Sequence, residues 1–350
     1  MMENSMKYHY SAMKFGYNGD LNSDRNRKSI SDKWFYAYPD KLSRKPLPFL
    51  EECILTAKII RDNTSLPIHV LLSGGHDSVG VAESFRLAKI PFRAAIAVFD
   101  KGLNHHDIIY AFDYCKKFSI PYDTYNLNVE KFWENDLLYY AEPVQCRSPQ
   151  WLVQNWLIDQ VDGYPVLGNG EPWTYKGINP FLIDQNIIGT EFMREEAEAT
   201  QFNEKWLIHK SRDGCGKFYK YTKELKVSGL FDPVIIQWMK SHRETKTTIS
   251  LDKYKNEIYP LWFPGIGIRK PITYPSFTGK LKVIKRTDYT GFELISDLDR
   301  KYRKILTDMF SKEYDSFIAE TYIENLKVMC DGKDFMDKQL QWAIDEIKVK

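Results

Sequence analysis

The segment VLLSGGHDSVGVAESF, residues 70–85, joins an apolar run to a helix-like run through two adjacent glycines. The apolar run over 68–73 predicts a buried strand, and the pattern over 77–90 predicts a helix. Glycine has no Cβ, so Gly74 and Gly75 let the backbone adopt left-handed angles and approach a bound group closely. The other members of the junction are polar: Ser73, His76, Asp77 and Ser78. The junction therefore predicts a strand-to-helix turn that holds a ligand.

The chemistry of this turn favours an anion. The N–H groups at the start of a helix point outward and carry partial positive charge. Ser73 and Ser78 add hydroxyl donors, whereas Asp77 would repel a phosphate unless a cation lay between them. We therefore expect Mg²⁺ to bridge Asp77 and a phosphate. The turn lacks the lysine of a Walker A loop and the spacing of a G-x-G-x-x-G loop.

Strands and helices alternate beyond this junction. Further strands are predicted over 92–100, 122–129 and 164–170, and further helices over 105–119, 130–141 and 147–161. Alternation of this length is typical of βαβ units, so we expect an α/β fold: a parallel sheet with helices on both faces. A helix over 47–63 precedes the first core strand.

The ends of the chain follow different patterns, and we expect three parts: a small strand-rich element over 1–46, an α/β domain over 47–208 and a mixed, mostly helical region over 209–350. Within the last part, 213–229 resembles a hairpin, and 254–280 shows no clear element. The final sixty residues are predicted to be helical.

Composition argues for a soluble protein. Hydrophobic residues make up 43% of the chain and charged residues 27%, and no apolar run approaches the ~20 residues of a membrane span. The N-terminus lacks the apolar core of a signal peptide, so we expect a cytoplasmic location. Five scattered cysteines without C-x-x-C spacing predict buried reduced thiols rather than disulfides or a zinc site.

Charge is unevenly distributed. Residues 201–290 contain 18 Lys and Arg against 8 Asp and Glu, although the whole chain carries only +2. Such a segment could face nucleic-acid phosphates or form a solvated surface. Within it Lys217, Tyr219, Lys220, Tyr221 and Lys223 alternate. The alternation suits either stacking on a nucleic acid or an exposed hairpin with one packed aromatic face.

The residues from Ser73 to Ser78 match the S-G-G-x-D-S signature of the N-type, or PP-loop, ATP pyrophosphatases. The resemblance extends over residues 48–175, and the lead-in over 49–78 looks most like the synthetase domains of asparagine synthetase and GMP synthetase. It implies the fold of the adenine nucleotide alpha hydrolases, also called HUP. It also implies ATP as the cofactor, with Mg²⁺ bound at Asp77.

The resemblance further implies that ATP is cleaved between its α- and β-phosphates. The loop of Ser73, Gly74, Gly75, His76, Asp77 and Ser78 would bind the departing pyrophosphate, while AMP passes to an acceptor oxygen. Adenine would lie against the end of the second strand, at Ala97, Val98 and Phe99. Asp100 would face the ribose or a metal.

The segment VLGNGEPW, residues 166–173, ends the fourth predicted strand. Its members Gly168, Asn169 and Glu171 should therefore reach the same edge as the loop, near nucleotide, metal or substrate. A polar turn is the alternative. The segment is shorter than its counterpart in asparagine synthetases and lacks their additional acidic pair.

Other residues allow two interpretations each. Arg147 could bind phosphate or lie on the surface, and Cys146 could carry sulfur or be structural. His105 and Asp107 could bind a metal or cap a helix. His76 could reach the substrate or face solvent.

Three functions fit these observations. The first is an enzyme that adenylates a small-molecule acceptor before a nitrogen nucleophile attacks, with Asp77 and Glu171 as catalytic groups. No cysteine occurs in the first fifty residues, so we expect no fused glutaminase. The second is modification of a nucleobase or tRNA, which the basic segment favours. The third is a non-catalytic nucleotide-binding module.

Overall fold

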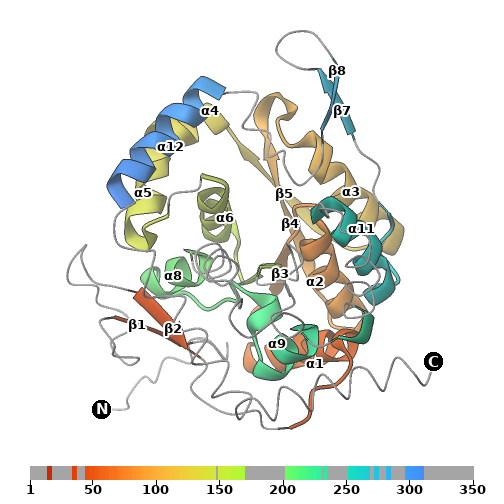
Figure 1. Ribbon diagram of the computed structural model, residues 1–350. Helices are drawn as coiled ribbons and strands as arrows, with labels where there is room; N and C mark the ends of the chain where they lie inside the picture. Colours follow the sequence, from red (N-terminus) through yellow and green to blue (C-terminus); the bar gives the residue numbers. More distant parts are fainter. Residues whose placement is uncertain are drawn as a thin grey trace, which may run out of the picture.

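The structure, a computed structural model, is shown in Figure 1. It describes residues 14–17, 34–37, 44–146, 149–169, 202–230, 232–234, 251–268, 272–275, 281–284 and 296–310. Four strands form its central sheet: β3 (Ile68–Leu71), β4 (Arg93–Phe99), β5 (Tyr122–Leu127) and β6 (Tyr164–Val166). All four are parallel, in the order β5-β4-β3-β6. The predicted α/β fold with a parallel sheet is confirmed.

Helices cover both faces of this sheet (Figure 1). One face carries α1 (Phe49–Asn63), α2 (His76–Leu87), α3 (His105–Phe118), α9 (Lys223–Leu230) and α11 (Leu251–Trp262). The other carries α4 (Val129–Lys131), η2 (Phe132–Asp136), α5 (Leu137–Ala141), η3 (Glu142–Val144), α6 (Pro149–Gln160), α8 (Phe202–His209) and α12 (Ser296–Phe310). Two short turns, η1 (Asp100–Gly102) and η5 (Phe218–Lys220), complete this part.

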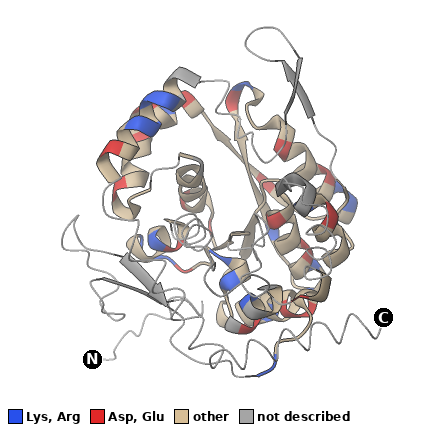
Figure 2. Ribbon diagram, in the orientation of Figure 1, with Lys and Arg blue, Asp and Glu red and all other residues tan. Residues whose placement is uncertain are grey.

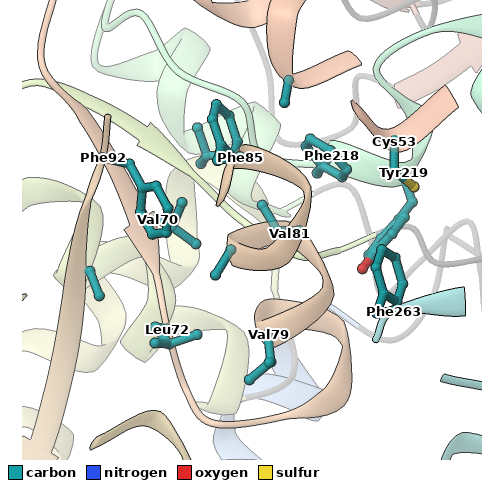
Figure 3. Packing of buried hydrophobic residues seen from close by; sticks show 14 of the residues in the cluster. Cys53, Val70, Leu72, Val79, Val81, Phe85, Phe92, Phe218, Tyr219 and Phe263 are labelled. Atoms are coloured by element: carbon teal, nitrogen blue, oxygen red, sulfur yellow. The ribbon is translucent and has the colours of Figure 1, made fainter. Parts of the chain in front are cut away.

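The two faces have separate hydrophobic cores because side chains alternate along a strand. Val70 and Leu72 pack under α2, while Leu71 between them packs on the opposite face. In Figure 3, Val79 and Val81 of α2 lie over these strand residues. A strand buried on both faces favours apolar residues on both sides, which explains Val70, Leu71 and Leu72 in succession before the loop; His69 is the one polar residue in β3 and is also buried.

Two smaller antiparallel sheets complete the described strands. β1 (Lys14–Tyr17) pairs with β2 (Trp34–Ala37), where the sequence predicts a strand-rich element. β7 (Ile272–Pro275) pairs with β8 (Leu281–Ile284). Among the described residues, no helix combines the length and the apolar character needed to cross a membrane.

Three sequence predictions need correction. The helix expected over 130–141 is interrupted by the π-turn η2. The hairpin expected over 213–229 is wrong, because η5 and α9 occupy it. The stretch over 254–280 begins within the helix α11, although Pro260 lies inside that helix. The proline removes only one backbone donor near the last turn, where packing outweighs that loss.

The expected boundary between 208 and 209 does not separate two cores. Phe218, Tyr219 and Phe263 pack against α2 in the same hydrophobic core as β3 (Figure 3). The backbone of the 215–219 segment bonds the outer side of the sheet at β6 and the residue after it. Leu167 N donates to Cys215 O at 2.8 Å, and Phe218 N donates to Leu167 O at 3.0 Å. Residues from the predicted third part therefore complete the α/β core.

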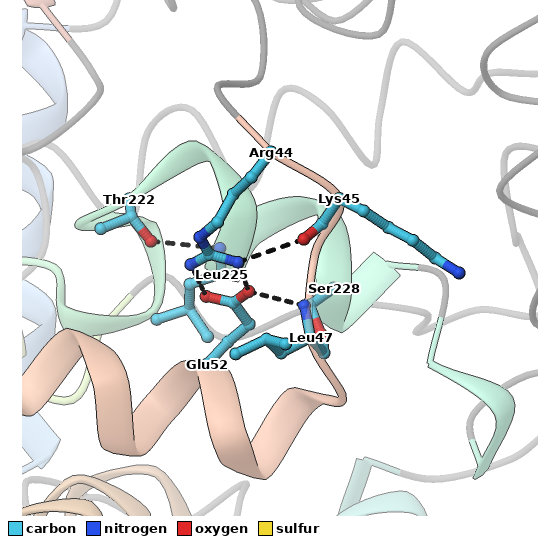
Figure 4. Close-up of polar contacts among 7 residues, drawn as sticks. All are labelled: Arg44, Lys45, Leu47, Glu52, Thr222, Leu225 and Ser228. Atoms are coloured by element: carbon cyan, nitrogen blue, oxygen red, sulfur yellow. Dashed lines mark hydrogen bonds and ion pairs between the residues drawn. The ribbon is translucent and has the colours of Figure 1, made fainter.

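A buried carboxylate fastens the start of α1 (Figure 4). Glu52 is fully buried and receives two hydrogen bonds from the Arg44 guanidinium, one of them 2.8 Å long. The Leu47 N–H donates to the same carboxylate at 2.7 Å, and Ser228 of α9 donates to Leu47 O at 2.6 Å. This network joins the 44–47 segment, α1 and α9.

Candidate active site

The glycine loop lies at the carboxyl end of β3, an inner strand of the sheet. β3 ends at Leu71 and α2 begins at His76, so residues 72–75 form the turn. Leu72 N still donates to Ala95 O of β4 at 2.9 Å, which holds the turn against its neighbouring strand. In parallel α/β sheets, ligands bind outside the carboxyl ends of the strands. The loop therefore occupies the expected position for a binding site.

The backbone conformation and the close packing at position 74 require glycine. Its φ is +86°, a region that side chains disfavour, and a Cβ there would lie 2.0 Å from the carbonyl oxygen of Asp107 in α3. This glycine lets the loop and the first turn of α3 come into contact. Gly75, the next residue, has an ordinary φ of −59° and is the N-cap of α2.

The two serines bond within the loop. Their hydroxyl oxygens are 3.1 Å apart. Gly75 N donates to Ser73 Oγ at 3.1 Å, and Ser78 Oγ donates to Gly75 O at 3.0 Å. These bonds fix the shape of the turn, and Ser73 remains exposed at its tip. The first N–H groups of α2 point outward from this turn, as at any helix start.

Two elements far along the chain hold the first turn of α2 in place. Gly168, just after β6, lies against the backbone of Asp77 and Ser78, since a Cβ on it would be 2.8 Å from Ser78 N. Tyr219 of η5 donates its hydroxyl to Asp77 O at 2.9 Å. The structure thus brings Gly168 to the loop, in a packing position where there is no room for a side chain, and its role in nucleotide binding stays a prediction.

The carboxylate of Asp77 is bonded by two side chains of α11. Lys255 Nζ pairs with Asp77 Oδ2, and the Tyr259 hydroxyl donates to Asp77 Oδ1. The Lys255 side chain is 9% exposed and that of Asp77 is 20% exposed. Lys255 and Tyr259 are four residues apart and so share one helix face. This spacing could have identified the pair from the sequence, but the sequence pattern predicted no helix over these residues.

His76 does not face solvent. It is 2% exposed, and its ring lies 5.5 Å from the ring of Tyr259, centroid to centroid. The imidazole therefore packs beneath α11 next to the Asp77 contacts. The solvent-facing interpretation of His76 is wrong.

The far end of α11 is anchored through Glu83 of α2. This buried carboxylate accepts two hydrogen bonds of 2.7 Å from Arg86, one of 2.8 Å from Tyr114 and one of 2.9 Å from the Gly265 N–H. Burial alone would raise the pKa of Glu83, but these hydrogen bonds outweigh it, and the pKa is lowered. Glu83 thus joins α2, α3 and the turn after α11.

Replacing Glu83 with glutamine should lower the free energy of unfolding at pH 7 by about 2 kcal/mol, because a buried charged network loses its acceptor. The folded pKa lies below the ordinary value of 4.5, so this stabilisation is complete above that value and is lost as the pH falls through the folded pKa. Urea unfolding of both proteins across this range should show the difference shrinking. Glu130→Gln, at an exposed pair with Lys101, is the control and should change little. A pH-independent difference would contradict this assignment.

The resemblance implies magnesium at Asp77, and the residues present do not suit it. Both carboxylate oxygens of Asp77 are bonded by α11, one of them to an ammonium group. Across the described ranges, no three His, Cys, Asp or Glu side chains gather closely enough to hold a metal ion. A divalent cation at this carboxylate would lie beside the Lys255 charge and be repelled. The metal role of Asp77 stays a prediction that this arrangement does not favour.

The strand predicted to receive adenine extends past its neighbour. β3 pairs with β4 only as far as Ala95, so Ala97, Val98 and Phe99 project beyond it. On this free edge the carboxamide of Asn104 donates to Ala97 O at 2.9 Å and accepts from Phe99 N at 2.9 Å. Asn104 precedes α3 but makes no side-chain cap bond to that helix. Its amide presents the same adjacent donor and acceptor as the edge of an adenine.

Asp100 also has a structural partner. Its Oδ1 accepts from the Val129 N–H at 3.0 Å, at the start of α4. The carboxylate thus ties the end of β4 to the end of β5. The predicted role on ribose or metal stays a prediction.

Asn169 lies in a buried cluster of amides rather than at the loop. It is 8% exposed, and its amide nitrogen donates to Gln154 at 3.0 Å and to Asn203 at 2.7 Å. Asn203 in turn donates to Asn155 at 2.8 Å. The cluster joins α6, α8 and the end of β6. Glu171 and Arg147 lie outside the described residues.

The other candidates are structural where they are described. Burial raises the pKa of the thiols of Cys53, Cys115 and Cys215, so they stay protonated and unreactive. Cys146 is fully buried.

The N-cap of α3 is Asn104, so the capping role predicted for His105 is wrong, while Asp107 lies in the first turn.

The basic segment is not an exposed stacking surface where it is described. Tyr219 and Tyr221 are both 1% exposed and belong to the core under α2. Lys217 and Lys220 are fully buried. Figure 2 shows Lys and Arg interspersed with Asp and Glu on the outer helices. Of the two interpretations of this alternation, stacking on a nucleic acid does not fit these two buried tyrosines; the aromatic rings are packed, but in and beside η5 and not in an exposed hairpin.

Fold and site together define an α/β protein with a glycine turn at the carboxyl end of an inner parallel strand, covered by a helix that carries a lysine and a tyrosine. Neither the known family models nor the curated proteins give a match to this sequence.

Proposed function

We propose that the protein is an ATP-dependent ligase of the PP-loop type, which forms AMP and pyrophosphate and has the HUP form of the α/β fold. The observation that carries the proposal is the place of the S-G-G-x-D-S segment. It forms the turn between an inner parallel strand and the helix that follows it. The N–H groups at the start of α2, the exposed Ser73 and the nearby Lys255 provide donors and positive charge for phosphate oxygens.

In the proposed reaction an oxygen of a small-molecule acceptor attacks the α-phosphorus of ATP. The bond between this phosphorus and the α–β bridging oxygen breaks. The pyrophosphate takes the bonding electron pair, and the hydrogen-bond donors of the loop bind it as it leaves. A nitrogen nucleophile then attacks the adenylated acceptor carbon and displaces AMP. The loop contributes by binding the charge that develops on the leaving group.

Product analysis tests the proposal. The protein is incubated with ATP labelled on the α-phosphate, Mg²⁺ and a pool of small metabolites. We expect label in AMP with release of one pyrophosphate, whereas label in ADP would contradict the proposed bond cleavage. Ser78→Ala should reduce turnover, and Ser84→Ala should not. Both serines lie in α2 and donate to backbone carbonyls, but only Ser78 adjoins the loop.

The free edge of β4 supplies a prediction about the base. Binding of adenine to Ala97 O and Phe99 N requires Asn104 to leave them. Asn104→Ala should therefore tighten ATP binding roughly 5- to 10-fold and lower the free energy of unfolding by about 1–2 kcal/mol, because two hydrogen bonds are removed from the free protein. Calorimetric titration and urea unfolding measure the two effects.

Asn128→Ala is the matched control for this variant. Asn128 is the N-cap of α4, and its side chain accepts from Lys131 N at 2.9 Å, away from the free edge of β4. Its loss should cost about 1 kcal/mol of stability and leave ATP affinity unchanged. Equal affinities for Asn104→Ala and the unsubstituted protein would place the base elsewhere.

A further inference from the structure

We propose that the positive charge met by a diphosphate at the loop is the ammonium group of Lys255, so that diphosphate binds there without a divalent cation. This inference rests on the proposed function and departs from the magnesium site that the resemblance implies. Lys255 pairs with Asp77, the only acidic residue in the glycine loop. The ammonium group therefore takes the position that a metal bridging Asp77 and phosphate would need.

The surroundings of Lys255 keep its ammonium group near the loop. The α11 helix is held at its far end by the Gly265 N–H bond to Glu83, and Phe263 and Trp262 pack in the core. Tyr259, one turn along α11, bonds the second carboxylate oxygen of Asp77. Because three contacts orient α11, the charge of Lys255 is positioned before any ligand arrives.

Charge balance explains why one lysine can do this. A carboxylate beside a phosphate is repulsive, and an ammonium between them offsets one unit of negative charge. An ammonium has three donors and a full positive charge, so a contact with Asp77 does not by itself prevent Lys255 from attracting phosphate oxygens. The N–H groups at the start of α2 add partial positive charge at the loop.

Calorimetric titration with sodium pyrophosphate tests this inference, once in EDTA and once in excess MgCl₂. We expect the unsubstituted protein to bind in both buffers, with dissociation constants within about 3-fold of each other, less than half of the 1.4 kcal/mol that a tenfold difference represents. Lys255→Met should weaken binding in EDTA at least 10-fold. Lys255→Arg, which keeps the charge, should retain most of it. Lys58→Met, an exposed lysine of α1, removes the same charge and should change nothing.

The outcomes separate this inference from the proposed function. Binding only in MgCl₂, with Lys255→Met equal to the unsubstituted protein, would overturn the lysine assignment and leave the ligase proposal standing. Absence of binding in both buffers would overturn the pyrophosphate site itself, and with it the proposed function. Circular dichroism of each variant distinguishes loss of binding from loss of folding. If the methionine variant unfolds, the unsubstituted protein compared in EDTA and in MgCl₂ still decides whether diphosphate needs a divalent cation.

Discussion

Replacing Gly74 with alanine should lower the free energy of unfolding by roughly 3 kcal/mol or more, the largest stability effect expected of any single methyl group in the loop. Two penalties add at this position. The backbone φ of +86° disfavours a side chain, and the new Cβ would lie 2.0 Å from Asp107 O. The atom in the way belongs to the backbone of α3, so no side-chain rotation can relieve the contact. Urea unfolding followed by fluorescence measures the change.

Two other glycines separate these penalties. Gly102 has a φ of +69°, but its nearest neighbour would be 3.9 Å from an added Cβ, so Gly102→Ala should cost only about 1 kcal/mol. Gly267 has open space and no positive φ, so Gly267→Ala should change little. If Gly74→Ala lowered the free energy of unfolding no more than Gly102→Ala, the backbone of α3 would not restrict the space at Gly74.

Replacing Asp77 with alanine should reduce AMP-forming turnover roughly 100- to 1000-fold, a loss typical of removing a group that positions transition-state charge. Stability should also fall by about 2–3 kcal/mol, because the largely buried Lys255 loses this counter-charge. The sequence alone suggests that this variant keeps its stability, since no core volume is lost. The contact with α11 changes that expectation. Turnover is measured as AMP release and stability as urea unfolding.

The double variant Asp77→Ala/Lys255→Met distinguishes the two effects. It removes both charges together, so it should regain much of the stability lost in Asp77→Ala while remaining inactive. Asp113→Ala, at an exposed carboxylate of α3, is the control and should match the unsubstituted protein. Full turnover in Asp77→Ala would refute the assignment of the loop as the active site.

The local sequence pattern was sufficient to predict the parallel sheet and the glycine turn. The strand at Ile68–Leu71 and the helix at His76–Leu87 follow from an apolar run, two glycines and a helical period, all within twenty residues. The local pattern gave the wrong prediction where a segment is buried on all sides by the rest of the protein. Lysine and tyrosine follow one another in turn over 217–221, which suits either a stacking surface or an exposed hairpin with one packed aromatic face. In the folded chain both sets are buried, so the alternation no longer marks an inside and an outside.

By itself, the sequence determined the parallel α/β core and the placement of the glycine turn at the end of its first strand, because both depend on residues adjacent in the chain. Only the tertiary structure decided what surrounds Asp77. Lys255 lies 178 positions away, on a helix that the sequence pattern concealed. The same holds for Asn104, whose amide bonds the edge of β4 only because η1 turns the chain back. Charge and hydrogen-bond partners at this site depend on packing between distant segments, which no local periodicity encodes.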